Sequence, residues 1–110
     1  DVISIHAPLN ERTKDLITHK ELKSMNPNGY IVNMGRGGII NEADLAAALD
    51  EGIIAGAAVD VFTKEPLPAE HPYLIMKKRD KLLLTPHIGW ASKEAREVLV
   101  AMIADNIKYI

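Results

Sequence analysis

Residues 30–61 read YIVNMGRGGIINEADLAAALDEGIIAGAAVDV and contain two short apolar runs, 30–34 and 55–61, separated by a helical pattern. Asn41 has a side chain suited to a helix N-cap, and Gly52 is suited to a left-handed helix end. A strand, a helix and a second strand in this order form a unit whose strands run parallel. The segment therefore predicts an α/β fold.

Two more apolar runs predict further strands on either side of this unit. Val2–Ile5 precedes it and 82–85 follows it, which brings the predicted strands to about four. Compact apolar runs of this kind are typical of strands that are covered on both faces. We therefore expect part of a doubly wound, Rossmann-like parallel sheet with flanking helices.

Helix and loop signals lie between and after these strands. Thr18 and Glu21 form a capping-box pattern, which predicts a short helix before the second strand. Three prolines within 65–72 predict an extended loop, because proline lacks a backbone donor. Ser92 is suited to cap a long final helix, whose apolar face requires a partner surface. That face consists of Ala95, Val98, Leu99, Met102, Ile103 and Ile107.

The composition narrows the class of protein. Of the 110 residues 47% are hydrophobic and 25% charged, as in an ordinary globular domain. With 13 Lys and Arg against 15 Asp and Glu, the net charge is −2, so we expect no nucleic acid partner. No apolar run approaches the roughly 18 residues of a membrane span, so we expect no membrane partner. Cysteine is absent, which excludes thiolate chemistry, and the histidines lack metal-ligand spacing, so we expect no metal.

The start of the chain indicates a fragment. Residue 1 falls at the first predicted strand, and there is no initiator Met. Open parallel sheets of the doubly wound type usually contain more than four strands. We therefore expect residues 1–110 to form one unit that is part of a larger domain.

Four polar side chains follow predicted strands at their carboxyl ends. Arg36 comes after the second strand, Asp60 ends the third, Glu65 lies in the following loop, and His87 follows the fourth. Since ligands of open parallel sheets bind outside this edge, we expect the four side chains to converge there. Taken one by one, they also fit ordinary structural roles, such as a solvated loop Arg or a hydrogen-bonding His. The Gly-rich loop around Arg36 does not have the pattern G-x-G-x-x-G, so it is only a weak indication of phosphate binding.

In combination, the motifs of the chain resemble the D-isomer-specific 2-hydroxyacid dehydrogenase family. The resemblance covers nearly the whole chain, and its specificity comes from the order and spacing of the motifs. The matching segments are His6-Ala7-Pro8-Leu9 with Thr13, Met25-Asn26-Pro27, Val32-Asn33-Met34-Gly35-Arg36-Gly37-Gly38, Ala57-Ala58-Val59-Asp60-Val61-Phe62, Glu65-Pro66-Leu67 and Leu84-Thr85-Pro86-His87-Ile88. Residues 87–92, with Trp90, are most similar to the glycerate dehydrogenase or hydroxypyruvate reductase branch.

The resemblance implies reversible hydride transfer between NAD, or NADP, and a 2-oxo acid. His87 is then the general acid/base, and Arg36 binds the substrate carboxylate. Glu65 orients the His87 imidazole and favours its charged form. Asp60 is expected to bind the nicotinamide carboxamide. The cofactor-binding residues implied are His6, Pro8, Thr13, Met34, Gly35, Arg36, Asp60, His87 and Gly89.

The same resemblance implies that residues 1–110 are the second half of a dinucleotide-binding domain. The Gly-rich dinucleotide loop and the substrate domain of the family are absent from the chain, so we expect it to be inactive alone. The parent is expected to be a cytoplasmic homodimer acting on a small 2-oxo or 2-hydroxy acid, with hydroxypyruvate and glycerate as candidates.

Two other interpretations remain open from the sequence. Corepressors of the same family bind NAD and keep the three catalytic positions, so a non-catalytic NAD sensor is an alternative. A structural module without a ligand is the other. NAD binding without turnover of a substrate favours the sensor, and absence of NAD binding favours the structural module.

Overall fold

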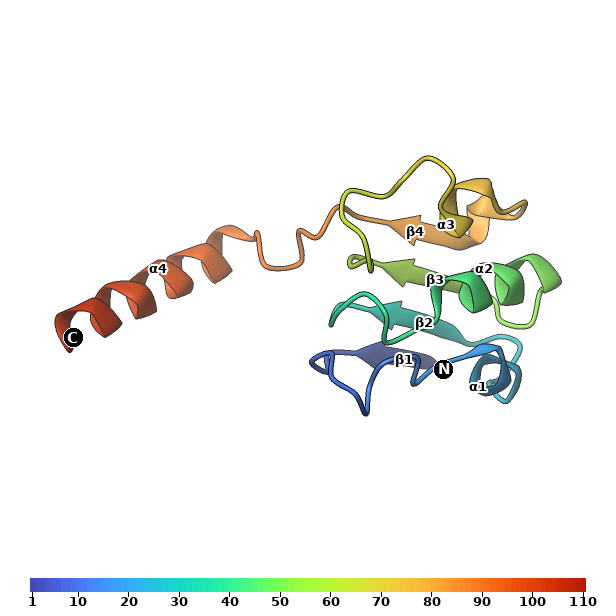
Figure 1. Ribbon diagram of the computed structural model, residues 1–110, viewed down its shortest axis with the longest axis horizontal. Helices are drawn as coiled ribbons and strands as arrows, with labels where there is room; N and C mark the ends of the chain where they lie inside the picture. The colour runs from blue at the N-terminus through green and yellow to red at the C-terminus, as the bar shows by residue number, and fades with distance from the viewer.

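Four parallel strands form a single sheet in the order β1-β2-β3-β4 (Figure 1). The computed structural model describes residues 1–110. The strands are β1 (Val2–Ile5), β2 (Tyr30–Asn33), β3 (Gly56–Val59) and β4 (Leu82–Leu84). Every neighbouring pair is parallel and in continuous register. Each observed strand lies within its predicted range, and the α/β fold class is confirmed.

Three helices begin directly after their predicted N-caps, Thr18, Asn41 and Ser92, and the second of these also ends at the predicted Gly52. The helices of the chain are α1 (His19–Lys23), α2 (Glu42–Glu51), α3 (Pro72–Ile75) and α4 (Lys93–Lys108), with a 3₁₀-helix over Arg79–Lys81. At the start of α2, Asn41 Oδ1 accepts a hydrogen bond from the Asp44 amide at 3.0 Å. Gly52 ends that helix with φ of 75°, the left-handed conformation that glycine adopts without strain.

Two short helices were not predicted. The prolines up to Pro72 indicated only a loop, but Pro72 is the first residue of α3, where its missing N–H costs no hydrogen bond. His71 caps this helix by accepting the Tyr73 amide at Nδ1. A four-residue helix has too few periodic positions to be recognised from its sequence.

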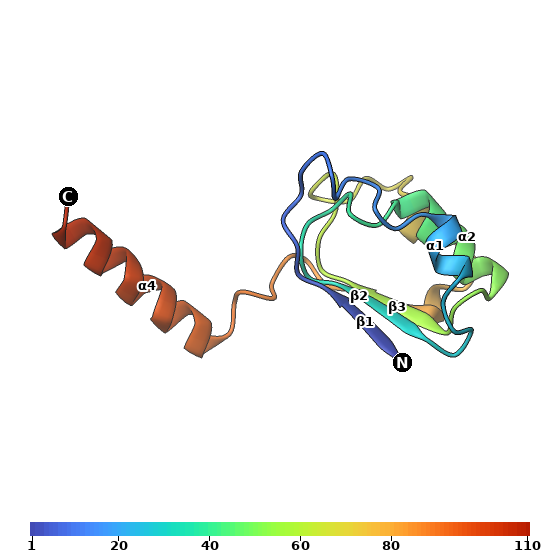
Figure 2. The same ribbon diagram turned by 90° about the horizontal axis from the view of Figure 1, so that it is seen from below.

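The helices α1, α2 and α3 cover one face of the sheet. Figure 2 shows α1 and α2 on the same side of the strands. Between them lies a core that includes Leu22, Ile31, Leu45, Leu49, Ile54, Val59 and Tyr73. On the opposite face Val2 and Leu83 are each 65% exposed. The prediction that both faces are covered is therefore wrong for this chain, because an apolar strand requires a cover but does not specify which segment supplies it.

The helix α4 projects away from the sheet (Figure 1). Ser92 Oγ caps it by accepting the Ala95 amide at 3.1 Å, as predicted. None of its residues is buried, so the predicted apolar stripe exists without a partner surface in the chain. No helix of the structure has the length and apolar character needed to cross a membrane.

Candidate active site

The carboxyl ends of all four strands border one polar cleft of about 330 Å³. It is lined by His6, Met34, Arg36, Asp60, His87, Gly89 and Trp90. His6 follows β1, Met34 and Arg36 follow β2, Asp60 follows β3, and the remaining three follow β4. Residues more than eighty positions apart in the sequence therefore meet at one edge of the sheet, as the parallel topology requires.

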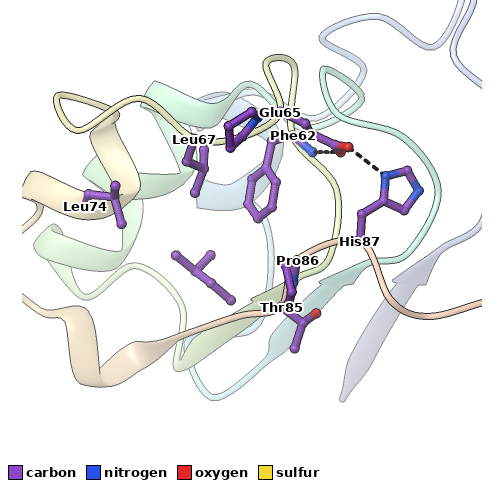
Figure 3. Close-up of a pocket in the computed structure, with 9 residues that line it drawn as sticks. Phe62, Glu65, Leu67, Leu74, Thr85, Pro86 and His87 are labelled. Atoms are coloured by element: carbon purple, nitrogen blue, oxygen red, sulfur yellow. Dashed lines mark hydrogen bonds and ion pairs between the residues drawn. The ribbon is translucent and has the colours of Figure 1, made fainter. Parts of the chain in front are cut away.

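His87 and Glu65 form a hydrogen-bonded pair at the border of the cleft. His87 Nδ1 lies 2.8 Å from Glu65 Oε2, and the second carboxylate oxygen accepts the Phe62 amide at 3.1 Å (Figure 3). The hydrogen bond from His87, followed by that from Phe62, holds the pKa of Glu65 below its usual range. An ionised carboxylate only accepts hydrogen bonds, so Nδ1 carries the proton. The other ring nitrogen, Nε2, has no partner in the chain.

The backbone of His87 is in the left-handed region, with φ of 57°. This conformation is uncommon for residues other than glycine and is kept only where surrounding contacts fix it. Here Trp90 Nε1 donates to the His87 carbonyl at 2.7 Å, and the His87 amide donates to Thr85 O at 3.1 Å. These contacts aim the imidazole at Glu65 on one side and leave its other side open.

Asp60 fixes the segment that carries His87. Its carboxylate accepts hydrogen bonds from Thr85 Oγ1, the Ile88 amide at 2.9 Å and the Gly89 amide at 2.9 Å. Burial alone would raise the pKa of Asp60, but these three hydrogen bonds outweigh it and hold the pKa below its usual range. The residue was expected to contact a cofactor. The structure gives it an additional task, the positioning of the His87 segment.

Arg36 stands on a turn shaped by buried Asn33. The Asn33 side chain accepts the Gly35 amide and donates to the Arg36 carbonyl, both at 3.0 Å. Within the chain, the guanidinium makes one hydrogen bond, from Nη1 to the Gly35 carbonyl at 2.8 Å. Its other N–H groups are free to form bidentate hydrogen bonds to a carboxylate.

Three of the expected cofactor-binding residues lie beside the cleft rather than in its lining. Thr13 Oγ1 donates to the Pro8 carbonyl at 2.7 Å, so these two residues fold the loop that follows β1. Gly35 packs against that loop, because a Cβ there would lie 2.7 Å from Ala7 O. Pro8, Thr13 and Gly35 thus support the wall formed by His6 without lining the cleft.

Sequence reasoning did not assign three supporting residues. Asn33 and Thr85 hold the turns of Arg36 and His87, and Trp90 lines the cleft while bonding to His87. Asn33 had a detectable signal, since it is a polar residue at the end of an apolar run. Thr85 acts through a contact with Asp60, which is distant in the sequence, and Trp90 acts through a turn that brings it back to the His87 carbonyl. Sequence spacing reveals neither contact.

An apolar hollow of about 500 Å³ lies on the other side of the Glu65–His87 pair (Figure 3). Its apolar walls come from Phe62, Pro66, Leu67, Leu74, Leu84 and Pro86. Glu65 and His87 thus separate an apolar region from the polar cleft. Arg36 and Asp60 accompany His87 only in the polar cleft, which makes that cleft the candidate site. No cluster of three or more His, Asp or Glu side chains suited to a metal ion is present.

The fold agrees with the comparison against known families. The NAD-binding domain profile of the D-isomer-specific 2-hydroxyacid dehydrogenases matches residues 1–89, which is most of the chain. The chain belongs to this family. The family resemblance inferred from the motifs is therefore confirmed.

Individual dehydrogenases of the family are also similar to the chain. It is 43% identical over 107 residues to a glyoxylate reductase of Thermofilum pendens, covering 97% of the chain and 31% of that protein. It is 41% identical over 108 residues to a glycerate dehydrogenase of Methylorubrum extorquens, covering 98% and 34%. The chain spans about a third of the length of these relatives.

A solved reductase structure has the same fold over nearly the whole chain. It is the NADPH-dependent glyoxylate/hydroxypyruvate reductase of Sinorhizobium meliloti, solved in complex with NADP and malonate. The TM-score is 0.83 at 33% identity, covering 98% of this chain and 33% of the reductase.

Proposed function

We propose that residues 1–110 are the second half of the dinucleotide-binding domain of an NAD(P)-dependent 2-hydroxyacid oxidoreductase. The family match concerns the NAD-binding domain, and the relatives are about three times as long as the chain. The chain contains no G-x-G-x-x-G motif, and the proposal assigns pyrophosphate binding to another part of the protein. On this proposal the chain alone is inactive.

The cleft fits the reactive end of a nicotinamide cofactor. Gly89 keeps it open, since a Cβ there would lie 2.4 Å from Met34 Cε and 3.1 Å from Asp60 Oδ2. Asp60 Oδ2 accepts one hydrogen bond from the chain and has a lone pair left for the cofactor carboxamide. When bound, the nicotinamide supplies or accepts a hydride. NAD is the cofactor we propose, with NADP as the alternative.

The observation that carries the proposal is the unpaired Nε2 of His87 in the same cleft as Arg36. Arg36 binds the carboxylate of a 2-oxo acid and polarises its carbonyl group. His87 Nε2 donates a proton to the carbonyl oxygen during reduction and removes the hydroxyl proton during oxidation. Glu65 stabilises the charged imidazole and keeps Nδ1 protonated. His87, Arg36 and Glu65 are therefore the catalytic residues of the proposal.

Small 2-oxo acids are the proposed substrates, with glyoxylate and hydroxypyruvate as the first candidates. The similar proteins include reductases and dehydrogenases of glyoxylate, hydroxypyruvate and glycerate. A cleft of about 330 Å³ lies at the small end of ligand sites, which suits a short acid beside a nicotinamide ring.

The test is an assay of the full-length protein for NADH and NADPH oxidation with glyoxylate, hydroxypyruvate and longer 2-oxo acids. Arg36→Ala is expected to raise KM for the acid and lower kcat, while Arg12→Ala, in the loop after β1, leaves both unchanged. Turnover that is equal in the two variants contradicts the role of Arg36. Cofactor binding without reduction of any acid replaces the proposal with the NAD-sensing alternative.

For the parent protein we also propose a homodimer in the cytoplasm, without nucleic acid or membrane partners. The apolar stripe of α4 supports association, because its large apolar side chains are exposed in the chain and contiguous exposed apolar patches commonly mark protein–protein contacts. Light scattering on the full-length protein measures the mass, and a monomer contradicts the dimer.

A further inference from the structure

We propose that Glu42, at the start of α2, is a positioning residue that holds the turn carrying Glu65 and so orients His87. The effect on catalysis rests on the function proposed above, whereas the geometric effect does not. Glu42 reaches the turn through Thr63, and His71 holds the Glu42 carboxylate in place. Neither Glu42 nor His71 lines the polar cleft.

The carboxylate of Glu42 binds three donors, all outside its own helix. Oε1 accepts the Thr63 amide at 2.7 Å, and Oε2 accepts Thr63 Oγ1 at 3.0 Å and His71 Nε2 at 2.5 Å. A Glu in the first turn of a helix is commonly explained by the helix dipole or by capping. At α2, however, Asn41 is the cap. Glu42 therefore links α2 to the loop between β3 and α3.

The His71 contact is buried and directional. The side chains of His71 and Glu42 are 6% and 11% exposed. His71 Nδ1 accepts the Tyr73 amide at 3.1 Å, so it carries no proton, and Nε2 must donate to Glu42. With both ring nitrogens used, His71 has no capacity for proton transfer to a ligand, and its contribution is to hold the Glu42 carboxylate in place.

The link to catalysis runs through adjacent peptide groups. The Phe62 amide donates to Glu65 and the next amide, that of Thr63, donates to Glu42. Gly37 packs closely against the peptide group between Phe62 and Thr63, because a Cβ at position 37 would lie 1.9 Å from Phe62 C. The turn is thus held between the Arg36 loop and Glu42. If Glu42 releases Thr63, the Phe62 amide shifts and Glu65 loses its support.

Glu65 is only partly buried, so it depends on this support. Its side chain is 38% exposed, and the contacts that orient it are those with Phe62 and His87. Misplacement of a catalytic group by about 1 Å costs on the order of 10²-fold in rate. We therefore expect loss of the Glu42 contacts to lower kcat by about 10- to 100-fold.

The first test is a double-mutant cycle on kcat in the full-length protein. Glu42→Gln keeps the volume but places an amide donor against either the Thr63 N–H or the His71 Nε2–H. If Glu42 acts through Glu65, Glu42→Gln costs little in a Glu65→Gln background, because that background has already lost the ionic support of His87. A loss of the same size in both backgrounds overturns the proposal, since it shows a general structural effect.

Two further variants control for folding and charge. Thr63→Val removes one hydrogen bond to Glu42 and keeps the backbone amide. We expect a several-fold loss of kcat that disappears in the Glu65→Gln background. This variant tests the inference even if Glu42→Gln folds poorly. Glu51→Gln, at the other end of α2, removes a comparable contact to His19 at 2.9 Å and leaves kcat unchanged. An unaffected kcat in Thr63→Val and Glu42→Gln together contradicts the inference.

A crystal structure of the full-length Glu42→Gln variant tests the geometry without any assay. The expected result is a shifted turn in which the contact between His87 Nδ1 and Glu65 Oε2 is longer than 2.8 Å or broken. An unchanged contact overturns the positioning role. If the wild-type protein reduces no 2-oxo acid, the proposed function fails, and this structure still decides the role of Glu42.

Discussion

One histidine–glutamate pair lies at the border of the polar cleft, and another lies in the buried junction between α2 and the loop that joins β3 to α3. The pairs are similar in chemistry, with N···O distances of 2.8 Å for His87–Glu65 and 2.5 Å for His71–Glu42. They differ in environment, because the first pair is more than a third exposed and the second is nearly fully buried. A third pair, His19–Glu51, lies on the surface.

The difference that matters for function is the second ring nitrogen. His71 uses both nitrogens within the chain, whereas His87 keeps Nε2 unpaired in a cleft that also contains Arg36. A general acid or base must present a free nitrogen to its substrate. Burial and complete hydrogen bonding make the His71 pair a structural link, and partial exposure leaves the His87 pair available for chemistry.

The largest expected effect is on turnover at His87. His87→Ala removes the proton donor, and general acid–base catalysis typically contributes about 10²- to 10⁴-fold, so kcat of the full-length enzyme should fall by that factor. Its free energy of unfolding should change little, because the pair is solvent-accessible. Steady-state kinetics and urea unfolding measure the two effects. A variant that unfolds more easily but keeps its kcat would make this pair structural and break the comparison.

The second effect is on stability at His71. His71→Ala leaves the buried Glu42 carboxylate with fewer donors and opens a cavity, so the free energy of unfolding should fall by about 2–4 kcal/mol. The loss of kcat should be smaller than in His87→Ala. Urea unfolding followed by circular dichroism measures this change. If His71→Ala is as stable as the wild type, burial of this pair has no energetic consequence.

The third effect is the pH dependence of stability. Since hydrogen bonds lower the native-state pKa of Asp60, the ionised form stabilises the fold above its unfolded-state pKa of about 4, and this stability is lost as pH falls through the lower native value. Between about pH 5 and pH 3, the free energy of unfolding should decline less steeply in Asp60→Asn than in the wild type. Equal slopes in a series of urea titrations would contradict the assigned hydrogen bonds. Glu65→Gln should reduce the slope in the same direction.

The smallest effect is expected at the surface pair. His19→Ala removes a contact of 2.9 Å between side chains that are 36% and 54% exposed. Exposed ion pairs contribute about 0–1 kcal/mol, so neither stability nor kcat should change appreciably. Thermal unfolding and the same assay provide the measurement. This variant is the matched control for the other two histidines, and a large effect would remove the basis for ranking the pairs by burial.

Much of the fold was predictable from local sequence. The four strands and the caps at Asn41, Gly52 and Ser92 follow from apolar periodicity and the hydrogen-bonding capacity of single side chains. The α3 helix was missed because it is one turn long. The open sheet face was missed because apolar strands do not identify the segment that covers them.

The site was predictable in part. The convergence of Arg36, Asp60 and His87 follows from parallel topology, and their proposed roles come from the family resemblance. The junction of Glu42 with Thr63 and His71 was not predictable, because it joins residues 21 and 29 positions apart. His71 was set aside for lack of metal-ligand spacing, and Glu42 has an ordinary place in a helical first turn.

The sequence by itself determined the four strands and the three helices other than α3, which family the motifs resemble and which strand ends carry polar side chains. These properties depend on residue type, periodicity and order along the chain. Only the tertiary structure decided which of the histidine–glutamate pairs is buried, which ring nitrogen is free, and that Asp60 holds the His87 segment. Burial and hydrogen-bond saturation arise from contacts between distant segments, and these contacts exist only once the strands are in register.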